Sequence, residues 1–402
     1  MKRRVLFWCH SFLPTIGGVE LFAARLLPAL RSRGYEITVL TAEADRVEAS
    51  MNELEGVPIY RVPFHRAQTY GLDEATTAGK QKLNLEQNFV KPLFEVRARV
   101  IEILKAVSPD LVHLNSVYSD GFFYLTTVMF APAPLLFSLH GDWPISSTSI
   151  VERNLTSAAW VTAPSAGVLA KATQLVNKIA ERSSVVVHGA APPVVAPSPL
   201  PIDPPRIVCV GRLSPEKGFD VAVKAFARVV HRFPRALLII AGDGPERAAL
   251  EKQVDELKLS DRVKMVGWVA PDNVSSLLNT ATQVVIPSRS EGFGLVALQA
   301  ALVARPVVAT RVGGLPEVVV NGETGLVVES ENSKALAEAM VFLLTHPKHA
   351  ARVGQAAQMR ASELFSWERH VDAYDALYQR LIRQKHSYAG DPDPLADSNR
   401  NA

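Results

Sequence analysis

Short, almost continuously apolar runs alternate along this chain with longer segments whose apolar residues recur every three or four positions. The short runs suit parallel strands buried on both faces, and the longer pattern is that of amphipathic helices. Strands are predicted at residues 4–8, 36–40, 57–62, 110–114, 135–139, 160–163 and 184–187, and then at 206–210, 236–241, 262–266, 283–287, 306–309 and 325–328. This alternation predicts an α/β protein with doubly wound parallel sheets.

Helices are predicted where an apolar stripe follows a strand. Residues 220–232 place apolar side chains at i, i+3, i+4, i+7 and i+8, which puts them on one helical face. Comparable segments predict helices at residues 20–33, 295–304 and 367–383, and an arginine–proline pair stops the one that starts at 295.

A proline-rich stretch divides the chain near its middle. Seven prolines fall within residues 189–205, and proline suits neither a helix interior nor a central strand, so this stretch is predicted to be a linker or hinge. We therefore predict one Rossmann-like domain over residues 1–188, a second over 206–365 and a final helix at 366–385. The polar tail at 386–402 is expected to be disordered.

Composition changes this picture little. The 402 residues are 48% hydrophobic and 21% charged, and a net charge of +3 is too small to favour nucleic acid, so no nucleic-acid partner is predicted. Cys9 and Cys209 are expected to be buried in strands rather than joined in a disulfide, which favours a cytoplasmic location. The basic start imitates a signal peptide, but His10 and Ser11 break the apolar run, so a strand is predicted there. No stretch approaches the ~18 apolar residues of a membrane span.

Residues 211–218 follow the first strand of the second domain and carry Arg212 and Lys217 between glycines. An arginine and a lysine five positions apart on one loop can converge on a single anion. In open α/β sheets, ligands bind at this carboxyl end of the strands, which favours a phosphate site. The alternative is a pair of solvated surface cations.

Gly17 and Gly18 follow the first strand of the first domain and precede a predicted helix. Backbone N–H groups at a glycine-rich helix start can bind an anion, and a tight turn explains the pair as well. The G-x-G-x-x-G spacing of a dinucleotide site is absent here, which disfavours a dehydrogenase.

A carboxylate and two glycines stand at the start of the helix predicted at residues 295–304. Glu291 precedes Gly292, Phe293 and Gly294, and Gln299 lies further along the helix. The helix start favours negative charge, and the Glu291 carboxylate can accept hydrogen bonds from sugar hydroxyls. The alternatives are a simple N-terminal acid for Glu291 and a half-buried polar residue for Gln299.

His140 ends a strand of the first domain, in the sequence 138–142. It is predicted to donate a hydrogen bond to a substrate oxygen, with a structural role as the alternative. The turns at 242–245 and 312–317 either line the pocket or only reverse the chain. No histidine spacing suggests a metal site, the one Asp-x-Asp (Asp391, Asp393) lies in the tail, and neither a G-x-S-x-G motif nor a P-loop occurs.

Taken together in this order and spacing, these motifs resemble the retaining nucleotide-sugar glycosyltransferases of family four, across nearly the whole chain. The matching segments are Gly17-Gly18, the His140 turn, Gly211-Arg212, Lys217-Gly218, and residues 242–245, 267–269, 287–294, 313–317 and 321–325. The resemblance implies a GT-B fold, in which two Rossmann-like domains face a central cleft and a final helix crosses back to the first domain.

The resemblance also implies a reaction and roles for residues. A hexosyltransferase-type enzyme would move sugar from a nucleoside diphosphate sugar to a hydroxyl of a glycan, lipid-linked or small-molecule acceptor, without a metal or other cofactor. The transfer would retain the anomeric configuration by front-face attack. By the same resemblance, the diphosphate would meet Arg212, Lys217 and the backbone at Gly18, the base would meet the backbone near Val269, and the sugar would meet His140, Glu291 and the amides of Gly292, Phe293 and Gly294.

Two positions depart from the family pattern. Gln299 stands where a second glutamate is usual, and an amide is a weaker acceptor for ribose hydroxyls than a carboxylate. His188-Gly189 replaces a frequent Asn-Gly. A nucleotide-sugar-binding protein with weak or lost catalysis is therefore the second hypothesis, and an epimerase or phosphorylase on a similar scaffold is the third.

Residues 88–107 form a further amphipathic segment, with apolar positions opposite lysines and arginines. An ordinary helix of the first domain is favoured, and peripheral binding to the cytoplasmic face of a membrane is the alternative.

Overall fold

The computed structural model describes residues 3–43, 52–64, 91–117, 120–141, 143 and 148–388. The chain forms two compact units. The first contains residues 1–163, 169–186 and 371–402, and the second contains Pro164–Val168 and Val187–His370. The chain therefore leaves the first unit and returns to it twice, and the short stretch at 164–168 is the first of the two segments of the second unit.

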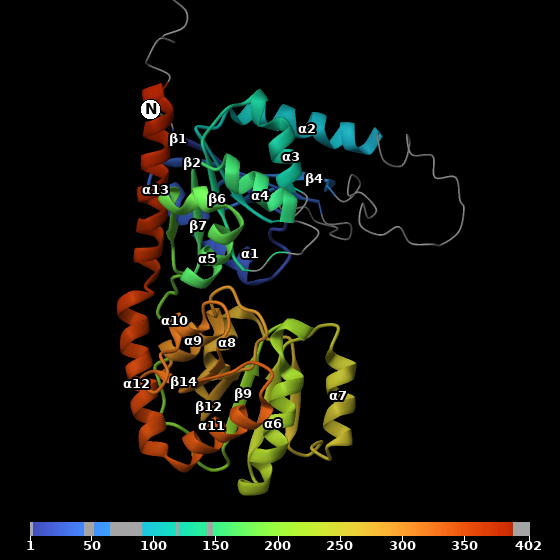
Figure 1. The fold of residues 1–402 in the computed structure, drawn as a ribbon, viewed down its shortest axis with the longest axis vertical. Coiled ribbons are helices and arrows are strands. Elements are labelled where there is room, and N and C mark those ends of the chain that lie inside the picture. The colour runs from blue at the N-terminus through green and yellow to red at the C-terminus, as the bar shows by residue number, and fades with distance from the viewer. Residues whose placement is uncertain are drawn as a thin grey trace, which may run out of the picture. The chain divides into compact units, whose positions relative to one another are not determined.

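The first unit is built on a sheet with strand order β3-β4-β2-β1-β5-β6-β7-β8. Figure 1 labels β1, β2, β4, β6 and β7 of this sheet, together with helices of the unit. All neighbouring pairs are parallel except β3 with β4. Its strands are β1 (Arg3–Cys9), β2 (Tyr35–Ala42), β3 (Glu53–Leu54), β4 (Val57–Val62), β5 (Leu111–Asn115), β6 (Leu135–Ser138), β7 (Trp160–Ala163) and β8 (Ser183–Val185). Its helical segments are α1 (Gly18–Ser32), α2 (Lys91–Val107), α3 (Asp120–Thr127), η3 (Val128–Phe130), α4 (Thr148–Ser157), η5 (Asn177–Arg182) and most of α5 (Ala166–Leu175).

The second unit has a fully parallel sheet with strand order β11-β10-β9-β12-β13-β14. Its strands are β9 (Arg206–Val210), β10 (Leu237–Ala241), β11 (Val263–Gly267), β12 (Gln283–Ile286), β13 (Val307–Thr310) and β14 (Gly325–Val328). Its helical segments are η6 (Pro215–Lys217), α6 (Phe219–Arg232), α7 (Arg247–Glu256), α8 (Pro271–Asn279), α9 (Leu295–Leu302), α10 (Leu315–Val318), α11 (Ser333–Thr345) and α12 (Pro347–Leu364). The last helix, α13 (Trp367–Tyr388), begins in this unit and continues in the first.

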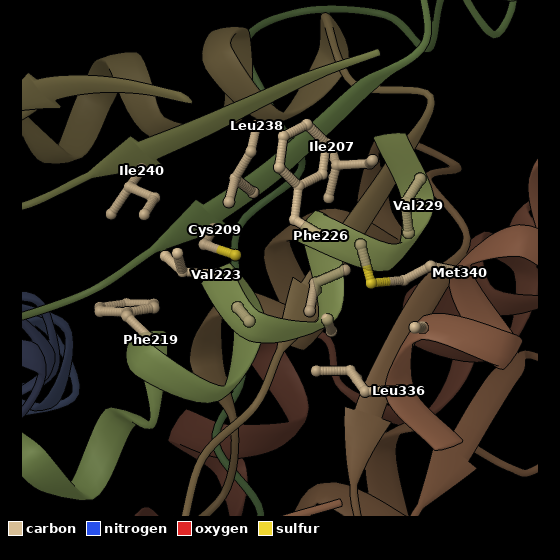
Figure 2. Packing of buried hydrophobic residues seen from close by; sticks show 14 of the residues in the cluster. Ile207, Cys209, Phe219, Val223, Phe226, Val229, Leu238, Ile240, Leu336 and Met340 are labelled. Carbon is tan, nitrogen blue, oxygen red and sulfur yellow. The ribbon is translucent and has the colours of Figure 1, made fainter. Parts of the chain in front are cut away.

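Helices cover both faces of the second sheet, so each face has its own apolar core. Figure 2 shows one core, in which Phe226 of α6 and Met340 of α11 pack beside Cys209 and Leu238 of the sheet. The other core joins α8, α9 and α10 to the opposite face. Phe226 is fully buried, and burial of such a side chain stabilises the fold by about 1.5–3 kcal/mol.

The observed elements follow the apolar pattern closely. Every predicted strand is present, with ends shifted by at most two residues, and the two-residue strand β3 was not predicted. The predicted helix at 295–304 ends earlier, at Leu302, because Ala304 adopts a left-handed conformation with φ of 55°. The helix predicted at 367–383 runs on to Tyr388.

The proline-rich segment at 189–205 contains neither helix nor strand, and it belongs to the second unit. Ser198 donates to Asn279 through its backbone N–H and its hydroxyl, and the buried Arg305 donates to the Ser198 carbonyl. Gly189 lies against the backbone of Ser366, where a Cβ atom would stand 2.5 Å from a carbonyl oxygen. The segment is therefore anchored along its length rather than running freely between two domains.

Helix α13 packs on the first unit through a buried polar cluster. His113 of β5 contacts the Tyr378 hydroxyl at 2.7 Å through Nδ1 and the Ser138 hydroxyl at 2.7 Å through Nε2. The Tyr35 hydroxyl donates to Asp375 at 2.6 Å. Burial raises the pKa of Tyr378 well above its usual value and lowers the pKa of His113, so both groups are neutral at physiological pH.

Other sequence expectations can now be placed. Cys9 and Cys209 are buried in β1 and β9 and form no disulfide, as predicted. Helix α2 buries Val96, Val100 and Ile103, as an ordinary helix of the unit does, and membrane association stays a prediction. No helix among the described ranges is long and apolar enough to cross a bilayer. Asp391 and Asp393 lie outside those ranges, as does most of the predicted tail.

Candidate functional site in the second unit

The candidate site forms where the strand order of the second sheet changes direction. From β9 the chain adds β10 and β11 on one side and then β12, β13 and β14 on the other. Loops after β9 and β12 consequently diverge, and a doubly wound sheet binds ligands in the crevice that this leaves at the carboxyl ends. Of the predicted site residues, these two loops carry Arg212, Lys217 and residues 291–294.

Lys217 and Glu291 meet at this point. The Lys217 Nζ atom lies 2.8 Å from Glu291 Oε2, and the Ser288 hydroxyl donates to the same oxygen at 3.2 Å. The side chains of Lys217 and Glu291 are 27% and 16% exposed, so the pair is half-buried but open to a ligand. The cation of one loop and the carboxylate of the other thus form a single polar centre, as expected if both act on one substrate.

Glycines let the backbones around this centre approach closely. A Cβ atom on Gly218 would lie 2.1 Å from the Pro287 carbonyl oxygen, and one on Gly313 would lie 1.5 Å from the Glu291 carbonyl oxygen. Gly294, with φ of 103°, is the residue before α9 and turns the chain into that helix. Only glycine adopts these positions without steric cost, which explains the glycines that flank Lys217 and Glu291.

The other predicted residues of this unit lie in the loop after β9, in the loop after β11 and on helix α9. Arg212 is exposed in the loop after β9, and Gln299 is half-buried on α9. Val269 is half-buried in the loop after β11 and packs against the core, and its neighbour Trp268 is 59% exposed. Phe293 is buried, and its ring centroid lies 5.5 Å from those of His188 and Phe365. These ring contacts anchor the loop after β12 to the interior of the unit.

The carboxyl of Glu216 lies next to both cations of the loop after β9. Burial alone would raise the pKa of Glu216, but hydrogen bonds from the Ser214 hydroxyl and from its own backbone N–H, followed by the charges of Lys217 and Arg212, hold that pKa below its usual value. Lys217 and Arg212 therefore both act on this end of β9 electrostatically.

Gly17, Gly18 and His140 belong to the first unit. Gly17 immediately precedes α1 and Gly18 is its first residue, so the pair stands at a helix start as predicted. His140 follows β6 and contacts the Asn115 side chain through Nε2. Its ring also lies 5.6 Å from the Phe22 ring. Asp142, the last residue of the predicted turn, lies outside the described ranges.

Sequence reasoning missed several residues that hold the site together. Ser288 and Arg289 lie inside the predicted loop but gave no separate signal. Ser288 contacts Glu291, only three residues away, whereas Arg289 contacts Pro215, which is distant in sequence. The buried Ser165 donates to the Gly292 carbonyl at 2.9 Å, and Glu317 accepts from the Ala166 amide at 2.8 Å. Only the Gly-Gly-Leu-Pro-Glu turn at 313–317 hinted at the last contact. Within the described ranges, no cluster of three or more histidine, cysteine or acidic side chains could hold a metal ion.

Comparison with known proteins shows that the protein with this fold and this site is a glycosyltransferase. A family model described as "Glycosyltransferase Family 4" matches residues 16–199, and one described as "Glycosyl transferases group 1" matches residues 195–360. The two models together span most of the chain, and the chain belongs to this glycosyltransferase family.

Some relatives match nearly the whole length of this chain. An uncharacterized glycosyltransferase of Methanocaldococcus jannaschii is 27% identical, over 92% of this chain and 96% of its own. A D-inositol 3-phosphate glycosyltransferase of Rhodococcus jostii is 28% identical, over 94% of this chain and 88% of its own.

Solved structures show the fold. Sucrose-phosphate synthase from Thermosynechococcus elongatus superposes with a TM-score of 0.75 at 23% identity, over 95% of this chain and all of its own. The Anabaena protein HepE, solved in complex with UDP and glucose, gives 0.74 at 22% identity, over 96% of this chain and all of its own. The fold is GT-B, as the resemblance to family four implied.

Proposed function

We propose that this glycosyltransferase moves a sugar from a nucleoside diphosphate sugar to an acceptor hydroxyl, with retention at the anomeric carbon and without a metal ion. The observation that carries the proposal is the 2.8 Å contact between Lys217 and Glu291, which joins the loops after β9 and β12. A donor of this kind needs a cation for its diphosphate and an acceptor for its sugar hydroxyls, side by side. The UDP in the HepE structure supports a uridine donor as the first to test.

The leaving diphosphate is the part of the donor that needs nearby positive charge, because negative charge builds up on it as the bond to the sugar breaks. Lys217 has three N–H donors, so it can bind a phosphate oxygen while it keeps its contact with Glu291. Arg212 offers a planar fork on the same loop. Each well-placed donor of this type can lower a barrier by about 3–4 kcal/mol.

The loop after β12 would bind the transferred sugar. The Glu291 carboxylate would accept from sugar hydroxyls, and the amides of Gly292, Phe293 and Gly294 lie just ahead of α9, whose N-terminal end favours negative charge. We assign His140 of the first unit a hydrogen bond to a sugar oxygen, and Gly17 and Gly18 a backbone contact with the diphosphate. Val269 and Gln299 are assigned to the base and the ribose.

The reaction itself needs no protein nucleophile. The acceptor oxygen bonds to the anomeric carbon as the bond from that carbon to the phosphate oxygen breaks, and the acceptor proton passes to the departing phosphate. Attack and departure on one face retain the configuration. The acceptor is a hydroxyl of a glycan, a lipid-linked sugar or a small molecule.

Gln299 supports a second candidate, a nucleotide-sugar-binding protein with little turnover. An amide on α9 replaces the usual carboxylate, and it offers ribose hydroxyls a weaker acceptor. Binding without release of nucleotide would favour this candidate over the first.

A donor panel tests the proposal. UDP-, GDP- and ADP-sugars are incubated with the wild-type protein and with Arg212→Ala and Lys217→Ala, and free nucleoside diphosphate is measured. We expect release from at least one donor and a loss on the order of a hundredfold in each variant. NMR of the product then reports whether the anomeric configuration is retained. Release from both variants that is as fast as release from the wild-type protein would reject the phosphate roles.

A further inference from the structure

Arg289 makes several polar contacts near the candidate site, with partners from three other segments. Its backbone N–H donates to the Glu216 carbonyl at 2.7 Å, and its Nη1 donates to the Pro215 carbonyl at 2.6 Å. The guanidinium also pairs with Asp220 at 2.9 Å and 3.0 Å, and with Glu331 through Nε and Nη2. One side chain thus joins the loop after β12 to η6, to the first turn of α6 and to the loop after β14.

These contacts surround Lys217 without touching it. Pro215 and Glu216 are the two residues before Lys217 in η6, and Asp220 follows it in α6. Arg289 itself lies two residues before Glu291. We call these contacts of Arg289 with Pro215, Glu216, Asp220 and Glu331 the Arg289 tether. The tether holds the backbone of the loop after β9, which carries Lys217, against the loop after β12, which carries Glu291.

The surroundings indicate that this tether is built at some cost. Glu331 adopts a left-handed conformation with φ of 63°, which is unfavourable for a residue with a side chain by about 1–2 kcal/mol. Its carboxylate nevertheless stays on Arg289. Hydrogen bonds to Asp220 and Glu331 raise the pKa of Arg289, so the guanidinium stays charged.

We propose that Arg289 is a positioning residue for the donor diphosphate, which holds η6 so that Lys217 faces the substrate bound by Glu291. This inference rests on the proposed function. Arg289 acts through Lys217 because its own N–H groups are directed to two carboxylates and a backbone carbonyl. Arginine is required, since a lysine cannot bond three separated acceptors from one point.

A double-mutant cycle tests this role. The affinities of UDP, GDP and ADP are measured by calorimetry for wild type, Arg289→Ala, Arg289→Lys, Lys217→Ala and the double variant Arg289→Ala/Lys217→Ala. The control is Arg311→Ala, which removes a comparable arginine at the end of the next strand, paired at 2.8 Å with the exposed Glu329.

We expect Arg289→Ala and Arg289→Lys each to weaken the best-binding diphosphate roughly tenfold, and Arg311→Ala to leave it unchanged. Once Lys217 is replaced, removing Arg289 should cost almost nothing more. Two fully additive losses, or equal affinity in wild type and Arg289→Ala, would overturn the proposal, because Arg289 would then act on the ligand directly or not at all.

A measurement on the ligand-free protein keeps the two proposals separate. Hydrogen–deuterium exchange measures how fast the backbone amides of Lys217 and Gly218 exchange. These amides donate to the carbonyls of Ser214 and Pro215 within this loop. Faster exchange there in Arg289→Ala, but not in Arg311→Ala, supports the tether even if no nucleotide binds and the proposed function fails. Unchanged exchange in Arg289→Ala would overturn it.

Discussion

At the scale of single residues, the site depends on backbone that comes unusually close to other backbone. Gly313 and Glu291 come from loops that follow neighbouring strands, and there is no room between them for a methyl group. The sequence indicated these glycines through their motifs. It did not indicate which backbone each one faces, because that depends on contacts between segments far apart along the chain.

Replacing Gly313 with alanine should therefore disturb the loop that holds Glu291. The new Cβ atom would lie 1.5 Å from the Glu291 carbonyl oxygen, so that loop must move. A displacement of about 1 Å can reduce turnover on the order of a hundredfold. Nucleotide release from the donor sugar measures the effect.

Gly322→Ala is the matched control for this change. Gly322 also has a positive φ, of 80°, but nothing lies within 4 Å of its Cβ position. It should lose about 1–2 kcal/mol of stability through backbone conformation alone and keep its activity. Equal activity in the two variants would contradict the steric account.

Gln299 gives a second prediction at this scale. Gln299→Glu restores a charged acceptor on α9, and it should tighten binding of nucleoside diphosphates about tenfold if the side chain meets ribose hydroxyls. Calorimetry with the ribonucleotide and its 2′-deoxy analogue separates this contact from a general effect of charge. Unchanged or weaker affinity in Gln299→Glu would argue against the ribose assignment.

At the scale of elements, helix α13 shows most clearly where sequence reasoning ends. Its apolar stripe predicted a helix, and the resemblance implied its return to the first domain, but the polar cluster on its buried face was not predicted. His113, Tyr378 and Ser138 come from three separate elements. Each looks like an ordinary polar interruption of an apolar run until the fold brings them together.

Acidification should weaken the fold through buried histidines. Burial lowers the pKa of His113 well below 6.5 and that of His370 to about 4. Both stay neutral in the folded protein, whereas the unfolded chain takes up protons below about pH 6.5. The part of the unfolding free energy that comes from keeping these histidines neutral is therefore fully present above about pH 6.5. Between that pH and the lower pKa of the folded state it is lost, by about 1.4 kcal/mol per pH unit for each histidine.

The measurement is Tm between pH 7 and pH 5 for wild type and His113→Gln, with the exposed His231→Gln as control. His113→Gln should be less stable at pH 7 but show a shallower decline, and His231→Gln should follow wild type. Parallel curves for all three proteins would show that His113 does not contribute to the pH dependence.

At the scale of the whole molecule, the sequence was enough to predict two Rossmann-like units and the positions of nearly all strands along the chain. The order of the strands within each sheet was not predicted. It did not reveal that residues 164–168 belong to the second unit. That assignment rests on contacts such as Ser165 with Gly292, which are distant in sequence. The proline-rich stretch was recognised from composition, but its attachment to Asn279 and Arg305 required the fold.

Activity is expected to survive removal of divalent metal ions. Arg212 and Lys217 supply the positive charge that the leaving diphosphate needs, so EDTA should leave the initial rate unchanged. Parallel assays with added magnesium or manganese provide the comparison. A rate that falls in EDTA and returns with the added ion would contradict this prediction.

If the loops after β9 and β12 bind a donor diphosphate, the β-phosphate must contribute much of the affinity for the nucleotide. UDP, GDP and ADP are compared with their monophosphates by calorimetry, in wild type and in Lys217→Ala. We expect the best-binding diphosphate to bind about tenfold or more tightly than its monophosphate, and Lys217→Ala to remove most of this difference. If no diphosphate binds more tightly than its monophosphate, or if the difference is unchanged in Lys217→Ala, these loops do not bind the donor diphosphate as proposed.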